Sequence, residues 1–300
     1  MVKNQHYIPQ FYLNRFGTNG KIDIFDIKNN KYIKNSNISN WACEKYFYDI
    51  DLTKIEDELK IFKNIPGINI DEESYKKAIK NPQFIETTLS KLESKMSDYL
   101  NKIETDYSLI ENEDFLSIFF IFLRTISIRT TGYRASLENI TTQTSNWLKK
   151  LGVKNCVNYP IDIDPKELAK IEQLKYLISL PSLLKKSISF FNNYNIFIGK
   201  NDTDLGFIIS NEPFLHFELG FNDICFPINP HLAIIMQVKN VNDEFLICHS
   251  KPNTENIINL KISDVTKYNI FQNHMMSKYL FGNKLDLEST LKIISILKNK

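Results

Sequence analysis

The segment from residue 5 to residue 16 concentrates residue types that could do chemistry. It reads Gln5-His6-Tyr7-Ile8-Pro9-Gln10-Phe11-Tyr12-Leu13-Asn14-Arg15-Phe16. Histidine titrates nearest to neutrality without perturbation, so His6 is a candidate general acid, general base or metal ligand. The apolar and aromatic neighbours favour a buried segment, in which His6 would instead be a hydrogen-bonded structural residue that anchors the chain terminus. Both interpretations stay open at this point.

A second candidate site follows a predicted strand and is rich in carboxylates. Its residues are Ser210, Asn211, Glu212, Glu218 and Asp223, with His216 nearby. Carboxylates at strand ends hold Mg²⁺ in metal-dependent phosphodiesterases. We therefore take Glu212 and Asp223 as candidate metal ligands, and Asn211 and Glu212 as candidate catalytic residues. The sequence contains no ordered Asp…Glu-x-Lys spacing here, so a nuclease site stays one hypothesis among several.

The arginines form a third candidate group, because only four of the 37 basic residues are arginine. They are Arg15, Arg124, Arg129 and Arg134. Arg124 is flanked by large apolar residues, so we expect it to be partly buried and to need a carboxylate partner or an anionic ligand. The candidate internal partners are Glu86, Glu93 and Glu138. In the alternative interpretation, the side chains that bind the oxygens of a phosphate-containing substrate are Gln10, Arg15, Arg124 and Arg129.

Composition excludes several classes of protein. An apolar share of 43% with 12% aromatic residues is too rich for a disordered chain, and a net charge of +2 gives no global electrostatic footprint for nucleic acid. The sequence contains no GxGxxG, Walker A, HExxH or GxSxG motif. The four cysteines are scattered and include no CxxC pair, which favours reduced thiols in a cytosol over a structural zinc site.

The most apolar stretch, Phe115–Ile128, is too short for a bilayer span of about 20 residues, and Arg124 interrupts it. It therefore indicates a buried core helix. The first 16 residues lack the charged and apolar regions of a signal peptide. We accordingly predict a cytoplasmic protein with no membrane partner.

Hydrophobic periodicity predicts an α+β fold. A β-hairpin is expected at 20–34. Helices are expected at 51–63, 82–104, 165–192, 263–282 and 286–297. A further helix is expected to begin at 112, to be interrupted near Gly132 and to continue to 151. Short strands are expected at 195–199, 206–210, 232–238, 244–248 and 256–262. We predict one domain over 1–300, in which a helical layer from the middle of the chain packs on a mostly antiparallel sheet. Its parts are the N-terminal motif and hairpin (1–35), the helical part (82–192), and the sheet with the C-terminal helices (194–298).

The N-terminal segment resembles the opening of a bacterial family known only as a domain of unknown function. The hallmark of that family is His-[His/Tyr]-[Val/Ile]-Pro-[Gln/Arg]-[Phe/His]-[Tyr/Leu]-Leu-x-x-Phe, which matches residues 6–16. The hairpin pattern of the family matches Gly20–Asp26, and its Phe-Pro-[Leu/Ile]-[Ser/Asn/Thr]-Pro segment matches Phe226–Pro230. Where the family often has a Ser-Asp-x-Pro turn, this chain has Ser210-Asn211-Glu212-Pro213. The resemblance implies no reaction, and the family context suggests bacterial mobile or defence loci.

The departure at Asn211 is informative. If the aspartate of the family is a metal ligand or base, this chain must use Glu212 or has lost the activity. If the turn is structural, asparagine replaces aspartate easily, because both side chains form Asx turns.

These observations lead to two hypotheses. In the first, the chain is a nuclease-like, metal-dependent hydrolase that acts on nucleic acid or a nucleotide, with a divalent metal as candidate cofactor and phage defence or a toxin effector as candidate role. His6, Asn211 and Glu212 would be its catalytic residues. In the second, the chain is a non-catalytic binding or interaction module, with a protein as candidate partner, whose N-terminal His motif is a structural clasp.

Overall fold

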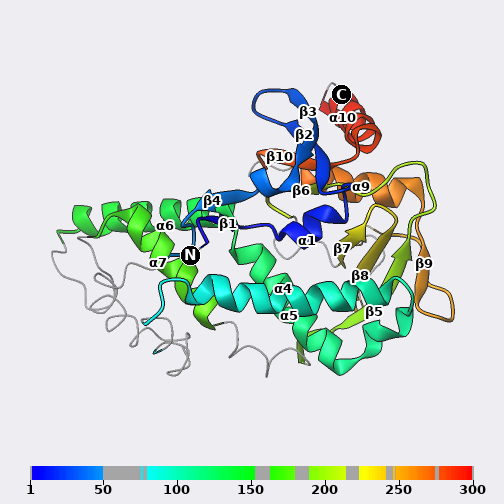
Figure 1. Ribbon diagram of the computed structural model, residues 1–300, viewed down its shortest axis with the longest axis horizontal. Coiled ribbons are helices and arrows are strands. Elements are labelled where there is room, and N and C mark those ends of the chain that lie inside the picture. The colour runs from blue at the N-terminus through cyan, green and yellow to red at the C-terminus, as the bar shows by residue number, and fades with distance from the viewer. Residues whose placement is uncertain are drawn as a thin grey trace. The chain divides into compact units, whose positions relative to one another are not determined.

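The computed structural model describes residues 2–49, 76, 80–152, 163–179, 189–213, 223–240, 246, 248–273 and 277–298. These residues confirm the α+β class, since long helices and two larger sheets both contribute to the fold (Figure 1). The chain divides into two compact units. Unit 1 comprises Met1–Tyr7, Cys43–Leu92 and Phe120–Lys185, and unit 2 comprises Ile8–Ala42, Glu93–Phe119 and Lys186–Lys300. The expectation of a single domain stays a prediction.

Unit 1 contains a two-stranded sheet and a helical part. Strand β1 (Asn4–His6) pairs antiparallel with β4 (Cys43–Lys45), so that His6 lies opposite Cys43. Helices α6 (Thr131–Lys150) and α7 (Pro165–Ser179) lie side by side (Figure 1). The predicted cap of α7 is confirmed, because Asp164 Oδ1 accepts a hydrogen bond from Lys166 N at 3.0 Å.

Helices α4 (Phe84–Ile103) and α5 (Glu113–Ile128) follow the predicted positions closely, and each contributes residues to both units. Asn112 caps α5, since its Oδ1 accepts a hydrogen bond from Phe115 N at 2.9 Å. The predicted interruption is confirmed, because α5 ends at Ile128 and α6 continues at an angle of 60° to it. Among the described residues, no single helix is both long and apolar enough to cross a bilayer.

The first four-stranded sheet of unit 2 has the strand order β3-β2-β10-β6. The predicted hairpin is confirmed as β2 (Lys21–Asp26) and β3 (Lys31–Asn37), which pair antiparallel. Strand β10 (Tyr279–Gly282) pairs antiparallel with β2 and with β6 (Ile209–Ser210). A small core against this sheet consists of Phe25, Ile208, Leu280 and Leu287.

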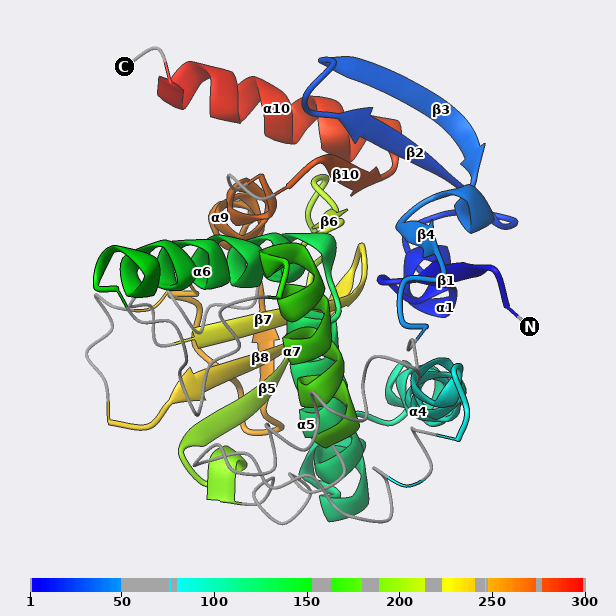
Figure 2. The same ribbon diagram turned by 90° about the vertical axis from the view of Figure 1, so that its left-hand side faces the viewer.

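The second four-stranded sheet of unit 2 has the order β7-β8-β5-β9. Strands β7 (Asp223–Asn229), β8 (Leu232–Val238) and β5 (Tyr194–Lys200) are neighbours and antiparallel (Figure 2). Strand β9 (Ile257–Asn259) is parallel to β5. The sequence did not predict β7, because Pro227 argues against a strand. The structure accommodates this proline at a register shift between Pro227 and Asn229.

The C-terminal region corrects one prediction. The helix expected at 263–282 is wrong in its second half, because α9 (Ile262–Gln272) ends early and Tyr279–Gly282 forms β10. Tertiary pairing with two neighbouring strands outweighs the helical pattern there. Helix α10 (Lys284–Lys298) then ends the described chain. The shorter helical elements are α1 (Gln10–Asn14) and the 3₁₀ helices η1 (Ile38–Asn40) and η2 (Tyr107–Glu111). The expected helix at 51–63 lies outside the described residues, as does most of the expected strand at 244–248.

Candidate functional site

The N-terminal strand of unit 1 is fastened by a buried glutamine. Gln5 is fully buried, and its side-chain amide forms hydrogen bonds with two residues that follow β4. Gln5 Nε2 donates to Asp49 Oδ1 at 2.6 Å, and Gln5 Oε1 accepts from Tyr48 N at 2.6 Å. An amide has both a donor and an acceptor, so one side chain satisfies both groups. This arrangement holds the strand that presents His6.

Arg129 completes this attachment from the end of α5. Its side chain is 1% exposed. Its Nη2 donates to the backbone carbonyl of His6, and its Nε donates to Tyr48 Oη at 3.1 Å. The Tyr48 hydroxyl also lies 3.2 Å from the Arg129 carbonyl oxygen, to which it donates. We call Gln5, His6, Tyr48, Asp49 and Arg129 the N-terminal clasp. In it, the planar guanidinium binds backbone and hydroxyl oxygens of its own chain.

Arg134 extends the same pattern one turn into α6. Its Nε donates to Gln173 Oε1 at 2.6 Å, and its Nη2 donates to the Phe47 carbonyl at 2.9 Å. The guanidinium carbon lies 3.6 Å from the centroid of the Phe47 ring, a cation–π contact. Burial lowers the pKa of Arg134 to about 10. These contacts fix the chain just after β4 against the helices of unit 1.

Gln173 satisfies the polar groups at the break between α5 and α6. Its side chain is fully buried. Its Nε2 donates to the Ile128 carbonyl at 2.7 Å and to the Thr130 carbonyl at 2.9 Å. The last carbonyls of a helix lack hydrogen-bond partners within the helix. The two bonds from Gln173 therefore replace the helical hydrogen bonds that are lost at the break. No sequence pattern singled out Gln173.

Arg124 does not behave as expected. The prediction that it is partly buried is wrong, because its side chain is exposed on α5. The reason is helical geometry: five residues rotate the direction of a side chain by about 140°, so Arg124 and the buried Arg129 lie on different faces. Large apolar neighbours in the sequence therefore did not imply a buried arginine.

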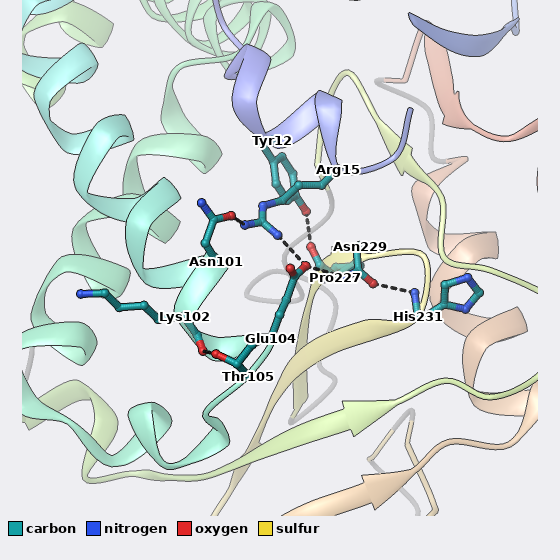
Figure 3. A network of polar contacts seen from close by, with 9 residues as sticks. All are labelled: Tyr12, Arg15, Asn101, Lys102, Glu104, Thr105, Pro227, Asn229 and His231. Carbon is teal, nitrogen blue, oxygen red and sulfur yellow. Dashed lines mark hydrogen bonds and ion pairs between the residues drawn. The ribbon is translucent and has the colours of Figure 1, made fainter. Parts of the chain in front are cut away.

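In unit 2, two segments quoted for the family resemblance pack directly on each other. The ring of Tyr12, from α1, stacks on Phe226, from β7, with centroids 5.0 Å apart. The Tyr12 hydroxyl donates to the Pro227 carbonyl at 2.8 Å (Figure 3). Complete burial raises the pKa of Tyr12 well above its usual value, so the hydroxyl stays a neutral donor. Residues 215 positions apart in the sequence are thus joined.

Arg15 takes part in a polar network beside this contact (Figure 3). Its Nη1 lies 2.8 Å from Glu104 Oε1, and its Nη2 donates to the side-chain carbonyl of Asn101. Asn229 Nδ2 donates to the same Glu104 oxygen at 2.8 Å, and Asn229 Oδ1 accepts from His231 N at 2.8 Å. Sequence reasoning missed Asn101, Glu104 and His231. The only available signal was for Asn229, which lies in the quoted Phe226–Pro230 segment.

The predicted acidic site is a buried turn in unit 2. Asn211 is fully buried, and its Oδ1 accepts from Lys278 N at 2.7 Å and from Tyr279 N at 2.8 Å. Its Nδ2 donates to Glu212 Oε1 at 3.2 Å. Glu212 is 6% exposed, and its backbone carbonyl accepts from Ser210 Oγ at 2.5 Å. Asn211 thus joins the end of β6 to the start of β10, as a structural turn residue would.

Asp223 is fully buried at the start of β7. Its Oδ2 accepts from Cys248 N at 2.9 Å and from Tyr268 Oη at 2.9 Å. His216 and Glu218 lie outside the described residues. Within the described ranges, no group of three or more His, Cys, Asp or Glu is placed to hold a metal ion. The metal role of Glu212 and Asp223 stays a prediction.

The candidate residues are distributed over both units. The structure brings His6 and Arg129 together in unit 1, and Asn211 and Glu212 together in unit 2. Arg15 also belongs to unit 2, where it meets Glu104 instead of another candidate. Gln10 is exposed at the first position of α1.

No curated protein and no solved structure matches the chain. One family model matches residues 4–284, a range that begins just before the N-terminal motif and ends at the start of α10. The match covers most of the chain, and it includes the clasp, the Tyr12–Phe226 contact and the turn at Asn211. The chain belongs to the family described as "Protein of unknown function (DUF4238)".

Proposed function

We propose that this chain is a non-catalytic binding module whose N-terminal His motif is a structural clasp. The bond between Arg129 and the His6 carbonyl supports the proposal most directly. This contact uses the backbone of His6, and it takes up a buried guanidinium that the catalytic hypothesis assigns to a substrate. A guanidinium committed to internal oxygens in the folded chain is not available to bind phosphate oxygens.

Contacts in unit 2 favour the same conclusion. Arg15 forms an ion pair with Glu104. Asn211 Oδ1 accepts two hydrogen bonds from the chain, and Asp223 Oδ2 also accepts two. Buried polar groups are normally satisfied in this way when they serve the fold. These side chains stabilise the turn, strand ends and helix packing on which a binding surface would rest.

A turnover assay tests this proposal against the hydrolase hypothesis. The purified protein is incubated with DNA, RNA and nucleotides in Mg²⁺ or Mn²⁺, alongside His6→Ala and Glu212→Gln variants. The proposal predicts that none of the three proteins converts any substrate. Turnover by the wild-type protein that either substitution abolishes, in a variant that melts as the wild-type does, would establish the hydrolase instead.

The His6→Ala variant also carries a stability readout. The side chain of His6 is half-buried on β1, the strand that the clasp holds, so its removal should lower the melting temperature while the capacity to bind a ligand is retained. An unchanged melting temperature would count against a clasp role for this side chain. The melting temperature and the turnover rate are measured on the same preparation, so loss of activity through unfolding is recognised directly.

A further inference from the structure

Helix α6 in unit 1 carries an apolar seam that its packing against α7 leaves exposed. Ile140, Trp147 and Leu151 are 60%, 60% and 59% exposed. They belong to a series of side chains that alternates steps of four and three residues along the helix and its C-cap: Tyr133, Leu137, Ile140, Thr144, Trp147 and Leu151. Two helices that pack side by side use this heptad spacing. We propose that the seam pairs, antiparallel, with the same seam of a second copy of this chain to form a homodimer.

The seam lies on a different side of α6 from the contact with α7. Thr141 and Ser145 are 5% and 3% exposed, and Thr141 Oγ1 donates to the Pro165 carbonyl at 3.2 Å, so these residues mark the side that faces α7. At about 100° per residue, Thr141 and Ser145 point about 100° and about 140° away from Ile140. The three exposed side chains present roughly 100–150 Å² each. They form an apolar patch of about 300–450 Å², a size that marks interaction sites on monomeric proteins.

The order of the seam suits a copy of itself that runs in the opposite direction. Its C-terminal members, Trp147 and Leu151, are exposed, whereas its N-terminal members, Tyr133 and Leu137, are half-buried. Antiparallel alignment about the midpoint of the seam therefore places each exposed end on a half-buried end. The layers of this pair are Leu151 on Tyr133, Trp147 on Leu137, and Ile140 on Thr144. A two-fold axis forms each layer twice, so one chain supplies both halves of the interface.

The charges of α6 favour the antiparallel direction. Lys149 and Lys150 both lie at its C-terminal end, and the side chains that flank the middle of the seam, Ser136 and Gln143, are uncharged. A parallel pair would bring four lysines together. In the antiparallel pair, the two copies of Lys150 lie about 24 Å apart along the axis, beyond the screening distance of about 8 Å. A membrane-bound helix carries cations along its polar face, whereas the lysines of α6 lie at one end, which favours a protein partner.

The exposed end of the seam is fixed before any partner binds. Leu151 N donates to the Trp147 carbonyl at 3.1 Å, and Gly152 N donates to the Lys149 carbonyl at 3.0 Å. Gly152 has a φ of +73°, the left-handed conformation in which glycine ends a helix without strain. Trp147 and Leu151 are therefore presented from an ordered turn, which lowers the entropic cost of association.

Sedimentation velocity of the full chain, from about 1 to about 300 μM, tests the proposal. Two copies of the patch bury about 600–900 Å² of apolar surface, less than a stable complex buries, so we expect a dissociation constant in the micromolar range. Ile140→Lys and Trp147→Lys each place a charge in the seam. Asn146→Lys is the matched control, because Asn146 is exposed on α6 about 120° away from the seam. The double variant Ile140→Lys/Thr144→Glu tests the direction of pairing.

We expect the wild-type protein and Asn146→Lys to dimerise with equal affinity, and each seam variant to bind itself about tenfold more weakly or worse, because its charge loses water in the interface. All variants should melt as the wild-type protein does at 1 μM or about that concentration, since the substituted side chains are solvent-accessible in the monomer. Adding Thr144→Glu should restore part of the affinity that Ile140→Lys removes, because only antiparallel pairing sets the two charges opposite each other.

A wild-type protein that stays monomeric over the whole range would overturn the proposal, as would equal association in the seam variants and the control. A double variant no stronger than Ile140→Lys would overturn the antiparallel direction. A monomer that sediments with phosphatidylserine vesicles would assign the seam to a membrane instead. Each of these results would leave the clasp untouched, because the clasp is tested by melting and turnover.

Discussion

Replacing Arg129 with methionine removes the centre of the clasp and leaves a side chain of comparable length. Two bonds from a charged donor are lost, one to the His6 carbonyl and one to the Tyr48 hydroxyl. Such bonds contribute about 1.5–3 kcal/mol each. The substitution also removes the cost of keeping a guanidinium away from water, which offsets part of the loss. We expect a net loss of about 3 kcal/mol in the free energy of unfolding.

The assay is thermal unfolding followed by calorimetry. At about 2–3 °C per kcal/mol for a chain of this size, the melting temperature should fall by about 6–9 °C. Arg124→Met is the matched control, because Arg124 lies on α5, the helix that Arg129 directly follows, and is exposed. Its effect should stay within about 0.5 kcal/mol. If Arg129→Met melts together with this control, the clasp does not stabilise the chain, and the reasoning is refuted.

Three further predictions concern other parts of the chain. Tyr12→Phe leaves the buried Pro227 carbonyl without its 2.8 Å partner and should cost about 1–3 kcal/mol in a denaturant titration; no measurable change would contradict this hydrogen bond. Burial raises the pKa of Cys248 to about 12, so alkylation at pH 8 followed by mass mapping should modify this thiol only after unfolding. Hydrogen bonds from Asn29 lower the pKa of Asp26, so their stabilising effect is complete above about pH 4 and is lost as the pH falls through the lowered value. The Asn29 amide signal in NMR should titrate below the usual aspartate pKa, and a midpoint above it would contradict this sign.

Much of the fold could be predicted because local signals agree with the tertiary structure. Helix α4 and the capped start of α5 follow from apolar periodicity and from Asn112. Apolar periodicity gives the wrong secondary structure where pairing with distant strands determines the conformation of a segment. Strand β7 contains Pro227, a residue that is unfavourable inside a strand, and it nevertheless pairs with β8. The chain at Tyr279–Gly282 pairs with two strands instead of continuing a helix. Neither outcome is encoded within the segment itself.

The candidate site was predictable only in part, for a related reason. The N-terminal segment could be recognised as buried and important from its composition. Its contacts with Tyr48, Asp49 and Arg129 could not, because these residues come from distant parts of the sequence and carry no motif. The arginine count drew attention to Arg15, Arg129 and Arg134, which all make contacts within the chain. It also drew attention to Arg124, which lies on an exposed face of α5. Whether a polar residue reacts or only supports the fold depends on partners that spacing alone does not reveal.

Amide hydrogen exchange at β1 and β4 tests the central claim most directly, because it reports on the clasp segment instead of the whole chain. The exchange rates of residues 4–6 and 43–45 are compared among the wild-type, Arg129→Met and Arg124→Met proteins. The clasp predicts slow exchange in the wild-type and Arg124→Met proteins, and much faster exchange in Arg129→Met. Equal protection in all three proteins would contradict the claim that Arg129 holds the N-terminal motif in place.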